Sequence, residues 1–163
     1  MTSLVGRALV LTASNRASAG VYEDTSGEFL ERELRQLGLD VHRTVLPDDT
    51  DALADAMRRA AADGIDLVLT TGGTGLSPTD VTPEATATVI DRPAPGLAEA
   101  IRAYGAPSVP TAVLSRGIAG IAVRTLIVNL PGSKGGVKDG LAVLAPLLGH
   151  ILSQLHGGDH PRP

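Results

Sequence analysis

Three short apolar segments alternate with two helical patterns in the first 71 residues, and this alternation constrains the fold more than any other feature. The apolar segments span residues 7–13, 39–46 and 66–71, and each is long enough for one buried strand. Strand, helix, strand, helix, strand with short right-handed connections places all three strands in one parallel sheet. The sequence therefore predicts an α/β fold of three layers, with a mostly parallel sheet covered by helices on both faces.

Turn and capping residues set the expected limits of the two early helices. Thr25 and Glu28 have the Ser/Thr-x-x-Glu spacing of a capping box, and Gly38 ends that helix. The second helix is expected to begin after the Pro47 to Thr50 turn, with Thr50 as the better cap, and to stop at Gly64.

The second half of the chain is less regular. Thr82 and Pro83 are a typical N-cap and first helical residue for a helix to about Asp91, and Pro95 opens another helix. Residues 105–117 have no clear pattern. A strand is expected over 125–130, with a short antiparallel partner around 118–123 that forms an edge hairpin. Apolar residues then recur at helical spacing from Val137 to Leu155.

Composition excludes several classes of protein. A chain of 163 residues has the length of one domain, expected over 1–156, with a disordered polar tail at 157–163. We expect a soluble cytoplasmic protein, because the N-terminus has no secretory signal and charge interrupts the apolar stretches. Cysteine is absent, which excludes disulfides and thiolate chemistry. One Phe, two Tyr and a net charge of −4 make nucleic acid an unexpected partner.

Common catalytic motifs do not occur in the sequence: there is no Walker-type phosphate loop, no G-x-G-x-x-G after the first strand, no G-x-S-x-G and no H-E-x-x-H. His150, His156 and His160 gather near the C-terminus, where a weak metal cluster is the alternative to a solvated helix end. We assign these histidines no catalytic role.

The run from Thr70 to Thr86 is the most informative candidate site. An apolar strand stops at Gly72, Gly73 and Gly75, and a carboxylate, Asp80, follows five residues after the last of them. Gly73 and Gly75 can adopt positive φ, so that successive N–H groups point into one concavity and bind an anion. A tight turn without a ligand is the alternative. A carboxylate beside such a cradle is expected to hold a cation, accept a hydrogen bond or cap a helix, and the Thr82 cap leaves Asp80 free.

Two further loops are expected at the same edge of the sheet. The loop from Ser14 to Gly27 carries hydroxyl groups ahead of a helix N-terminus, and the loop from Pro131 to Gly136 carries Lys134, one of only two lysines. A solvated loop with an ordinary cap explains either one taken alone. Asp48, just past the second strand, has the same ambiguity as Asp80. Together the three loops favour a site for an anionic small molecule.

Several ordered motifs closely resemble the MogA/MoaB family of molybdenum cofactor biosynthesis. They are Thr71-Gly72-Gly73-Thr74-Gly75, Asp80-Val81-Thr82-Pro83-Glu84-Ala85-Thr86, Pro95-Gly96, Leu114-Ser115-Arg116 and Asn129-Leu130-Pro131-Gly132, with Ser14-Asn15-Arg16 and Leu46-Pro47-Asp48-Asp49 earlier. The resemblance covers about residues 7–156. It implies a molybdopterin-binding fold that forms a homotrimer.

The resemblance also implies an activity for the MogA-type members. That activity is adenylyl transfer from Mg-ATP to the phosphate of molybdopterin, before a molybdate-insertion enzyme acts on the product. By this resemblance the functional carboxylates are Asp48 and Asp80, which we assign to organising Mg²⁺ and the triphosphate. Lys134 is assigned to a phosphate from its charge alone. The matching ligand-binding positions are Ser14, Asp24, Ser26, Gly27, Gly72, Gly73, Thr74, Gly75, Ser115 and Arg116.

Two departures from the family pattern leave its two functional types open. Gly117 stands where some relatives have serine, and residues 133–136 also differ from several relatives. The expected function is therefore a molybdopterin adenylyltransferase, with a MoaB-type carrier that binds molybdopterin without adenylylating it as the alternative. A different nucleotide- or pterin-binding protein on the same scaffold is the third possibility.

Overall fold

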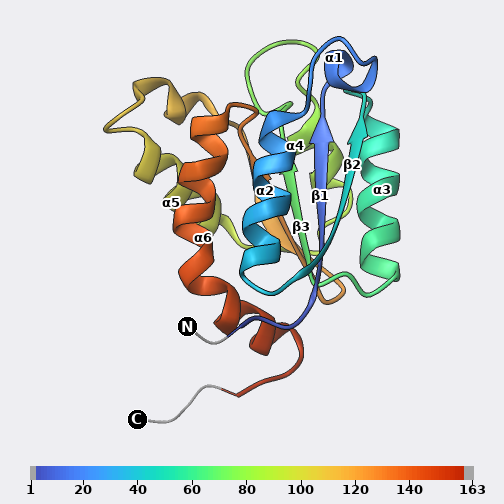
Figure 1. Cartoon of the computed structure of the whole chain (residues 1–163), viewed down its shortest axis with the longest axis vertical. Coiled ribbons are helices and arrows are strands. Elements are labelled where there is room, and N and C mark those ends of the chain that lie inside the picture. Colours follow the sequence, from blue (N-terminus) through green and yellow to red (C-terminus); the bar gives the residue numbers. More distant parts are fainter. Residues whose placement is uncertain (1–2, 160–163) are drawn as a thin grey trace.

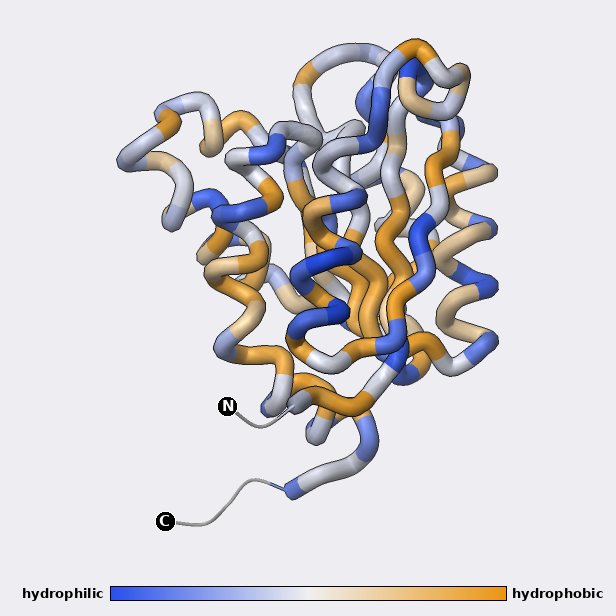
Figure 2. Tube along the Cα trace, viewed as in Figure 1, coloured by the Kyte–Doolittle hydropathy of each residue, from blue (hydrophilic) through white to orange (hydrophobic). Residues whose placement is uncertain are grey.

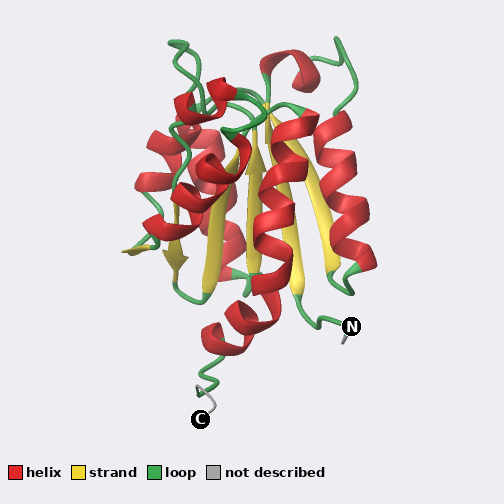
Figure 3. Cartoon of the chain, turned by 90° about the vertical axis from the view of Figure 1, so that its left-hand side faces the viewer, coloured by secondary structure: helices red, strands yellow, loops and turns green. Residues whose placement is uncertain are grey.

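The computed structural model describes residues 3–159, and these form a six-stranded sheet with helices on both faces (Figures 1 and 3). The strand order is β2-β1-β3-β6-β5-β4. Four neighbouring strands are parallel: β2 (Asp40–Leu46), β1 (Arg7–Ala13), β3 (Leu67–Thr71) and β6 (Thr125–Leu130). The antiparallel edge consists of β5 (Ala119–Ala122) and β4 (Arg92–Pro93). The predicted α/β class, its parallel strands and its edge hairpin are confirmed.

Two apolar cores lie on opposite faces of the sheet. The larger core packs α2 (Thr25–Gln36), α5 (Pro95–Gly105) and α6 (Lys134–Leu155) against one face. The smaller core packs α3 (Thr50–Ala62) and α4 (Thr82–Ala87) against the other. The apolar residues gather along the strands and the inner sides of the helices (Figure 2), as expected of parallel strands covered on both faces.

The first two long helices begin one residue earlier than the sequence predicts, because aspartates cap them. Asp24 caps α2 by accepting from the Gly27 N–H at 3.0 Å, so the predicted capping box that starts at Thr25 is wrong. Asp49 caps α3 by accepting from the Ala52 N–H at 2.8 Å, in place of Thr50. A carboxylate accepts this bond and also favours the positive end of the helix.

The region after β3 departs from the prediction in two ways. Thr82 is the first residue of α4 and makes no capping bond, because its hydroxyl donates to the Gly72 carbonyl at 3.0 Å. The helix ends at Ala87 and not near Asp91, since the Asp91 N–H donates to Ile121 and leads into β4. Two short helices have no counterpart in the sequence prediction: α1 (Asn15–Ser18), and the 3₁₀ helix η1 (Pro110–Leu114) within the unassigned stretch.

The last helix is long and apolar enough, by length and composition, to cross a membrane, which the sequence analysis did not expect. Its apolar side lies in the larger core, where Val137, Leu144 and Leu148 are fully buried. One side of α6 therefore packs into the larger core, and 33% of its most apolar 18-residue stretch is buried. After it, the Gly157 and Gly158 N–H groups donate to carbonyls of α6. Residues 160–163 of the predicted disordered tail lie outside the described residues.

Candidate functional site

The predicted loops meet at one edge of the sheet, because the parallel strands end together. Ala13 pairs in register with Leu46, and Thr71 pairs with both Thr12 and Leu130. The loops that follow these strands surround a cavity of about 370 Å³, here called the first cavity. It is lined by Thr12, Ala13, Ser14, Ala17, Tyr22, Glu23, Asp24, Thr25, Ser26, Asp48, Thr71, Gly72, Gly73, Asp80 and Gly132. This is where open α/β sheets bind their ligands.

The turn after β3 requires glycine at two positions. Gly72 has φ of 90°, and a Cβ there would lie 2.4 Å from the Ala13 carbonyl oxygen. Gly73 has φ of 68°, and its Cβ would lie 2.2 Å from the Thr82 hydroxyl. The prediction of positive φ at Gly75 is wrong. A Cβ at Gly75 would instead lie 2.7 Å from an Asp80 carboxylate oxygen, so this glycine makes room for that carboxylate.

Asp48 is held at the cavity by Asn15. The Asn15 N–H donates to Asp48 Oδ2 at 3.2 Å, and the Asp48 N–H donates to the Asn15 side-chain oxygen at 2.9 Å. Asp48 Oδ1 is buried and has no hydrogen-bond partner among the described residues. Burial raises the pKa of the Asp48 carboxyl, the bond from Asn15 opposes this rise, and the charge of Asp80 adds to it. The site therefore holds a carboxylate oxygen that lacks a partner.

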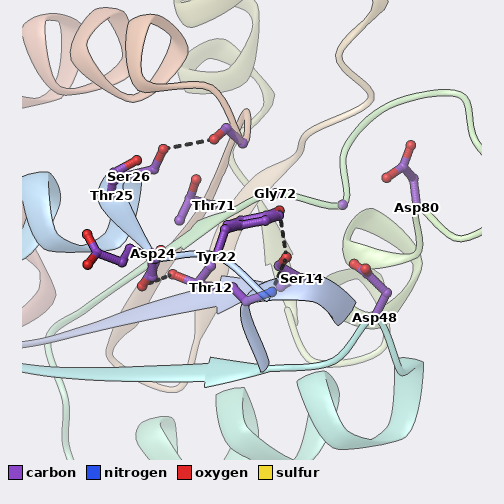
Figure 4. A pocket seen from close by; sticks show the side chains of 15 residues that line it. Thr12, Ser14, Tyr22, Asp24, Thr25, Ser26, Asp48, Thr71, Gly72 and Asp80 are labelled. Carbon is purple, nitrogen blue, oxygen red and sulfur yellow. Dashed lines mark hydrogen bonds between the residues drawn. The ribbon is translucent and has the colours of Figure 1, made fainter. Parts of the chain in front are cut away.

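Asp80 also lines the first cavity, near enough to Asp48 for its charge to raise the pKa of that carboxyl. One of its carboxylate oxygens accepts from the Ser77 N–H at 3.0 Å. In Figure 4, Asp48 and Asp80 lie at one end of the first cavity, Asp24 and Ser26 lie at the other, and Tyr22 and Ser14 lie between them. The lining includes four carboxylates and neither lysine nor arginine. Side-chain charge therefore cannot attract a polyphosphate here, and a bound cation would offset the repulsion.

Of three predicted ligand contacts at the far end of the cavity, Asp24 and Ser26 form part of its wall. Both oxygens of Asp24 are bonded, to the Gly27 N–H, to the Thr12 hydroxyl at 2.9 Å and to Arg43 at 2.9 Å. Ser26 donates to the Gly132 carbonyl at 2.8 Å. Gly27 does not line the cavity, and a Cβ there would collide with Asp24.

A second cavity of about 450 Å³ adjoins the first, and Gly72, Gly73, Asp80 and Gly132 line both. The predicted residues Thr74, Gly75 and Ser115 also line this second cavity.

Arg116 and Lys134 line neither of the two cavities. Lys134 is the exposed first residue of α6, whereas Arg116 is bonded to the loop that carries Asp80.

Sequence reasoning missed Tyr22, Thr12 and Thr71, although all three line the first cavity (Figure 4). The Tyr22 hydroxyl lies 3.0 Å from the Ser14 hydroxyl, which fixes the ring across the cavity. Thr71 donates to the Pro131 carbonyl at 2.7 Å. The scarcity of aromatic residues was the available signal for Tyr22, since it is one of three in the chain.

His150 and His156 line neither of the two cavities. His156 pairs with Asp66, just before β3, at the opposite end of the strand from the glycine turn. The described residues contain no group of three or more His, Cys, Asp or Glu side chains placed to hold a metal. His160 lies outside the described residues.

Comparison with known proteins identifies the family of the chain. Residues 9–150 match a family model described as a probable molybdopterin binding domain. A molybdopterin adenylyltransferase from Helicobacter pylori is 38% identical over 152 residues, which are 91% of this chain and 86% of that protein.

Solved structures are similar over nearly the whole chain. The molybdopterin biosynthesis Mog protein from Mycobacterium ulcerans has a TM-score of 0.89 and 49% identity, with 92% of this chain and 99% of that one covered. A molybdopterin biosynthesis enzyme MoaB from Thermus thermophilus has a TM-score of 0.83 and 41% identity, with 93% and 97% covered. The resemblance predicted from the sequence motifs is confirmed, and the chain belongs to the MogA/MoaB family of molybdopterin-binding domains.

Proposed function

We propose that this protein transfers the adenylyl group of ATP to the phosphate of molybdopterin. The observation that carries the proposal is the pair of adjoining cavities, which meet at Gly72, Gly73 and Asp80 and so offer room for two substrates side by side. Relatives that match nearly the whole chain, such as the one from Helicobacter pylori, are named molybdopterin adenylyltransferases. The transferred group would pass where the two cavities join.

The chemistry requires positioning more than a protein nucleophile. A phosphate oxygen of molybdopterin forms a bond to the α-phosphorus of ATP, while the bond from that phosphorus to the pyrophosphate oxygen breaks. Since the attacking phosphate is ionised at neutral pH, no general base is needed. The glycine turn lets backbone approach closely, and the hydroxyl of Ser14 offers a donor at the cavity wall. The mechanism therefore needs no thiolate nucleophile, and the absence of cysteine from the sequence is compatible with it.

The residues present fit a magnesium ion. Asp48 Oδ1 is buried with no hydrogen-bond partner among the described residues, and burial, followed by the nearby charge of Asp80, raises the pKa of the Asp48 carboxyl, so a bound cation would offset both effects. Mg²⁺ prefers oxygen ligands and completes its shell with phosphates and water. Asp48 and Asp80 would hold it. When bound, it would neutralise charge on the triphosphate.

The decisive test is incubation of the purified protein with molybdopterin and Mg-ATP, with detection of adenylylated molybdopterin and pyrophosphate. Formation of both supports the proposal. Tight binding of molybdopterin without formation of product would contradict the proposal and favour the MoaB-type carrier. Failure to bind molybdopterin at all promotes a different ligand on the same scaffold.

We expect Asp80→Asn to lower turnover by at least about 100-fold, because a neutral amide binds a cation weakly and leaves developing charge uncompensated. The asparagine oxygen can still accept from the Ser77 N–H, so the melting temperature should stay close to wild type. Asp55→Asn, at an exposed carboxylate on α3, is the matched control and should leave turnover unchanged. Lost melting stability in Asp80→Asn with unchanged turnover would contradict the metal role.

We further propose that a single domain over 1–156 assembles as a homotrimer in the cytoplasm and passes its product to a molybdate-insertion enzyme. These points rest on the family. Sedimentation of the full chain measures the assembly, and a monomer at micromolar concentration would overturn the trimer.

A further inference from the structure

Arg116 donates hydrogen bonds to both ends of the loop that carries Asp80, residues 74–80. Its backbone N–H donates to the Thr74 carbonyl at 2.8 Å, at the start of the loop. Its side-chain Nε donates to the Gly75 carbonyl at 2.8 Å. A second guanidinium nitrogen, Nη2, donates to the Asp80 carbonyl at 2.8 Å, at the end of the loop. Arg116, which lies 36 residues after Asp80 in the sequence, therefore bonds to the loop at three points.

The guanidinium is itself anchored to α4. Its remaining nitrogen, Nη1, bonds to a carboxylate oxygen of Glu84, and this bond lowers the pKa of the Glu84 carboxyl. All three nitrogens of the Arg116 side chain thus donate to protein acceptors in three directions. The planar fork of arginine suits this arrangement, whereas the single ammonium of lysine cannot reproduce it.

The loop has little else to hold it. Leu76 is 67% exposed, and residues 77–79 are also exposed, so core packing does not fix this segment. Within the loop, Ser77 and Asp80 bond to each other through the Asp80 N–H and the Ser77 N–H. These bonds shape the turn, and among the hydrogen bonds of the described residues only those from Arg116 tie residues 74–80 to another part of the fold.

We propose that Arg116 is a positioning residue that sets the Asp80 carboxylate between the two cavities, and that it does not contact substrate phosphate. Arg116 lines neither cavity, and each of its side-chain nitrogens already has a protein acceptor. The proposal rests on the function proposed above in one respect, since it takes Asp80 as a residue of the reaction. It revises the role that family resemblance alone suggests for this arginine.

The hold of Arg116 on the loop of residues 74–80 is tested first without any substrate. Backbone ¹⁵N relaxation of the free protein should give order parameters for Ser77 and Asp80 near 0.85 in wild type and below about 0.6 in Arg116→Lys. Val68 in β3 should stay rigid in both proteins, since it is fully buried in the sheet. Arg58→Lys is the matched control, because Arg58 also bonds to a carboxylate and a backbone carbonyl but lies away from the loop. It should leave Ser77 and Asp80 rigid.

The second measurement is kinetic. Arg116→Lys should lower kcat by about 10-fold to 100-fold with KM for ATP within about twofold, because misplacing a group slows the reaction step more than it weakens binding. Arg58→Lys should change neither constant. A raised KM for ATP with an unchanged loop would identify Arg116 as a phosphate contact and overturn the proposal. A mobile loop with unchanged kcat would overturn it as well.

The two experiments separate this proposal from the proposed function. If the wild-type protein makes no adenylylated product, the function fails, while the relaxation data on the free protein still decide whether Arg116 holds the loop. If the order parameters of Ser77 and Asp80 do not change in Arg116→Lys, the positioning role of Arg116 is overturned, whatever the activity of the wild-type protein.

Discussion

At the scale of single residues, Asp48 places a carboxylate that is costly to ionise at the wall of the first cavity. Its pKa is raised in the folded state, chiefly by burial, so the native protein binds this proton more tightly than the unfolded chain does. The ionised carboxylate therefore destabilises the native state at pH values above the raised pKa, and this penalty disappears as the pH falls through it. Such a cost at a cavity is typical of a residue kept for function.

We expect Asp48→Asn to melt at a higher temperature than wild type at pH 8, with the difference shrinking toward pH 4, because asparagine carries no charge to bury. Turnover should fall by about 100-fold if Asp48 helps to hold the cation. Thermal melts at several pH values and product assays measure both effects. Added Mg²⁺ should raise the melting temperature of wild type more than that of the variant. A lower melting temperature for Asp48→Asn at pH 8 would contradict the expected charge penalty.

At the scale of elements, α6 approaches β6 closely because Gly140 has no side chain. A Cβ at Gly140 would lie 2.5 Å from a Leu130 methyl carbon, and both residues are buried. Leu130 is the last residue of β6, directly before the Pro131–Gly132 turn that reaches the cavities. The packing of this helix therefore supports one wall of the site.

We expect Gly140→Ala to lower the free energy of unfolding by about 1–3 kcal/mol through overpacking against Leu130. Gly135→Ala is the matched control in the same helix, since a Cβ there meets nothing within 4 Å. It should leave stability unchanged or raise it by up to about 1 kcal/mol through helix propensity. Chemical denaturation measures both variants. Equal effects at the two positions would show that close packing at Gly140 does not matter.

At the scale of the whole molecule, a pair of side chains links the last helix to the end of the sheet away from the cavities. His156, at the C-terminal end of α6, lies 2.6 Å from a carboxylate oxygen of Asp66, whose side chain is only 9% exposed. The other oxygen of Asp66 accepts from the Arg7 N–H at 2.8 Å. The pair therefore joins α6 to the beginnings of β1 and β3.

Replacing this histidine should weaken the fold and spare the reaction. We expect His156→Ala to lower the free energy of unfolding by about 1 kcal/mol, because a buried carboxylate oxygen loses its partner. Turnover should not change, since the cavities lie at the opposite edge. Urea denaturation and product assays check this. His42→Ala, at an exposed residue on β2, is the control and should change the free energy of unfolding by less than about 0.5 kcal/mol. If His42→Ala lowered it as much as His156→Ala does, the contact between His156 and Asp66 would not explain the loss.

Much of the fold was predictable because its signals are local. Apolar runs and helical spacing identified the parallel strands and the long helices, and Gly38 and Gly64 do end their helices with positive φ. Helix starts were less predictable. Neighbouring residues such as Asp49 and Thr50 can both cap a helix, and the choice depends on which side chain the backbone turns toward the free N–H groups.

For the site, local sequence patterns identify the residues available where the parallel strands end: the glycine turn, Asp48, Asp80 and the loop that begins at Ser14, in motifs that indicate the MogA/MoaB family. How these residues are used depends on the folded chain. In the folded chain Arg43 donates to Asp24, the Tyr22 hydroxyl lies beside that of Ser14, and one oxygen of Asp48 has no hydrogen-bond partner among the described residues. These outcomes depend on side-chain directions and on contacts between segments far apart in the chain, which no local pattern records.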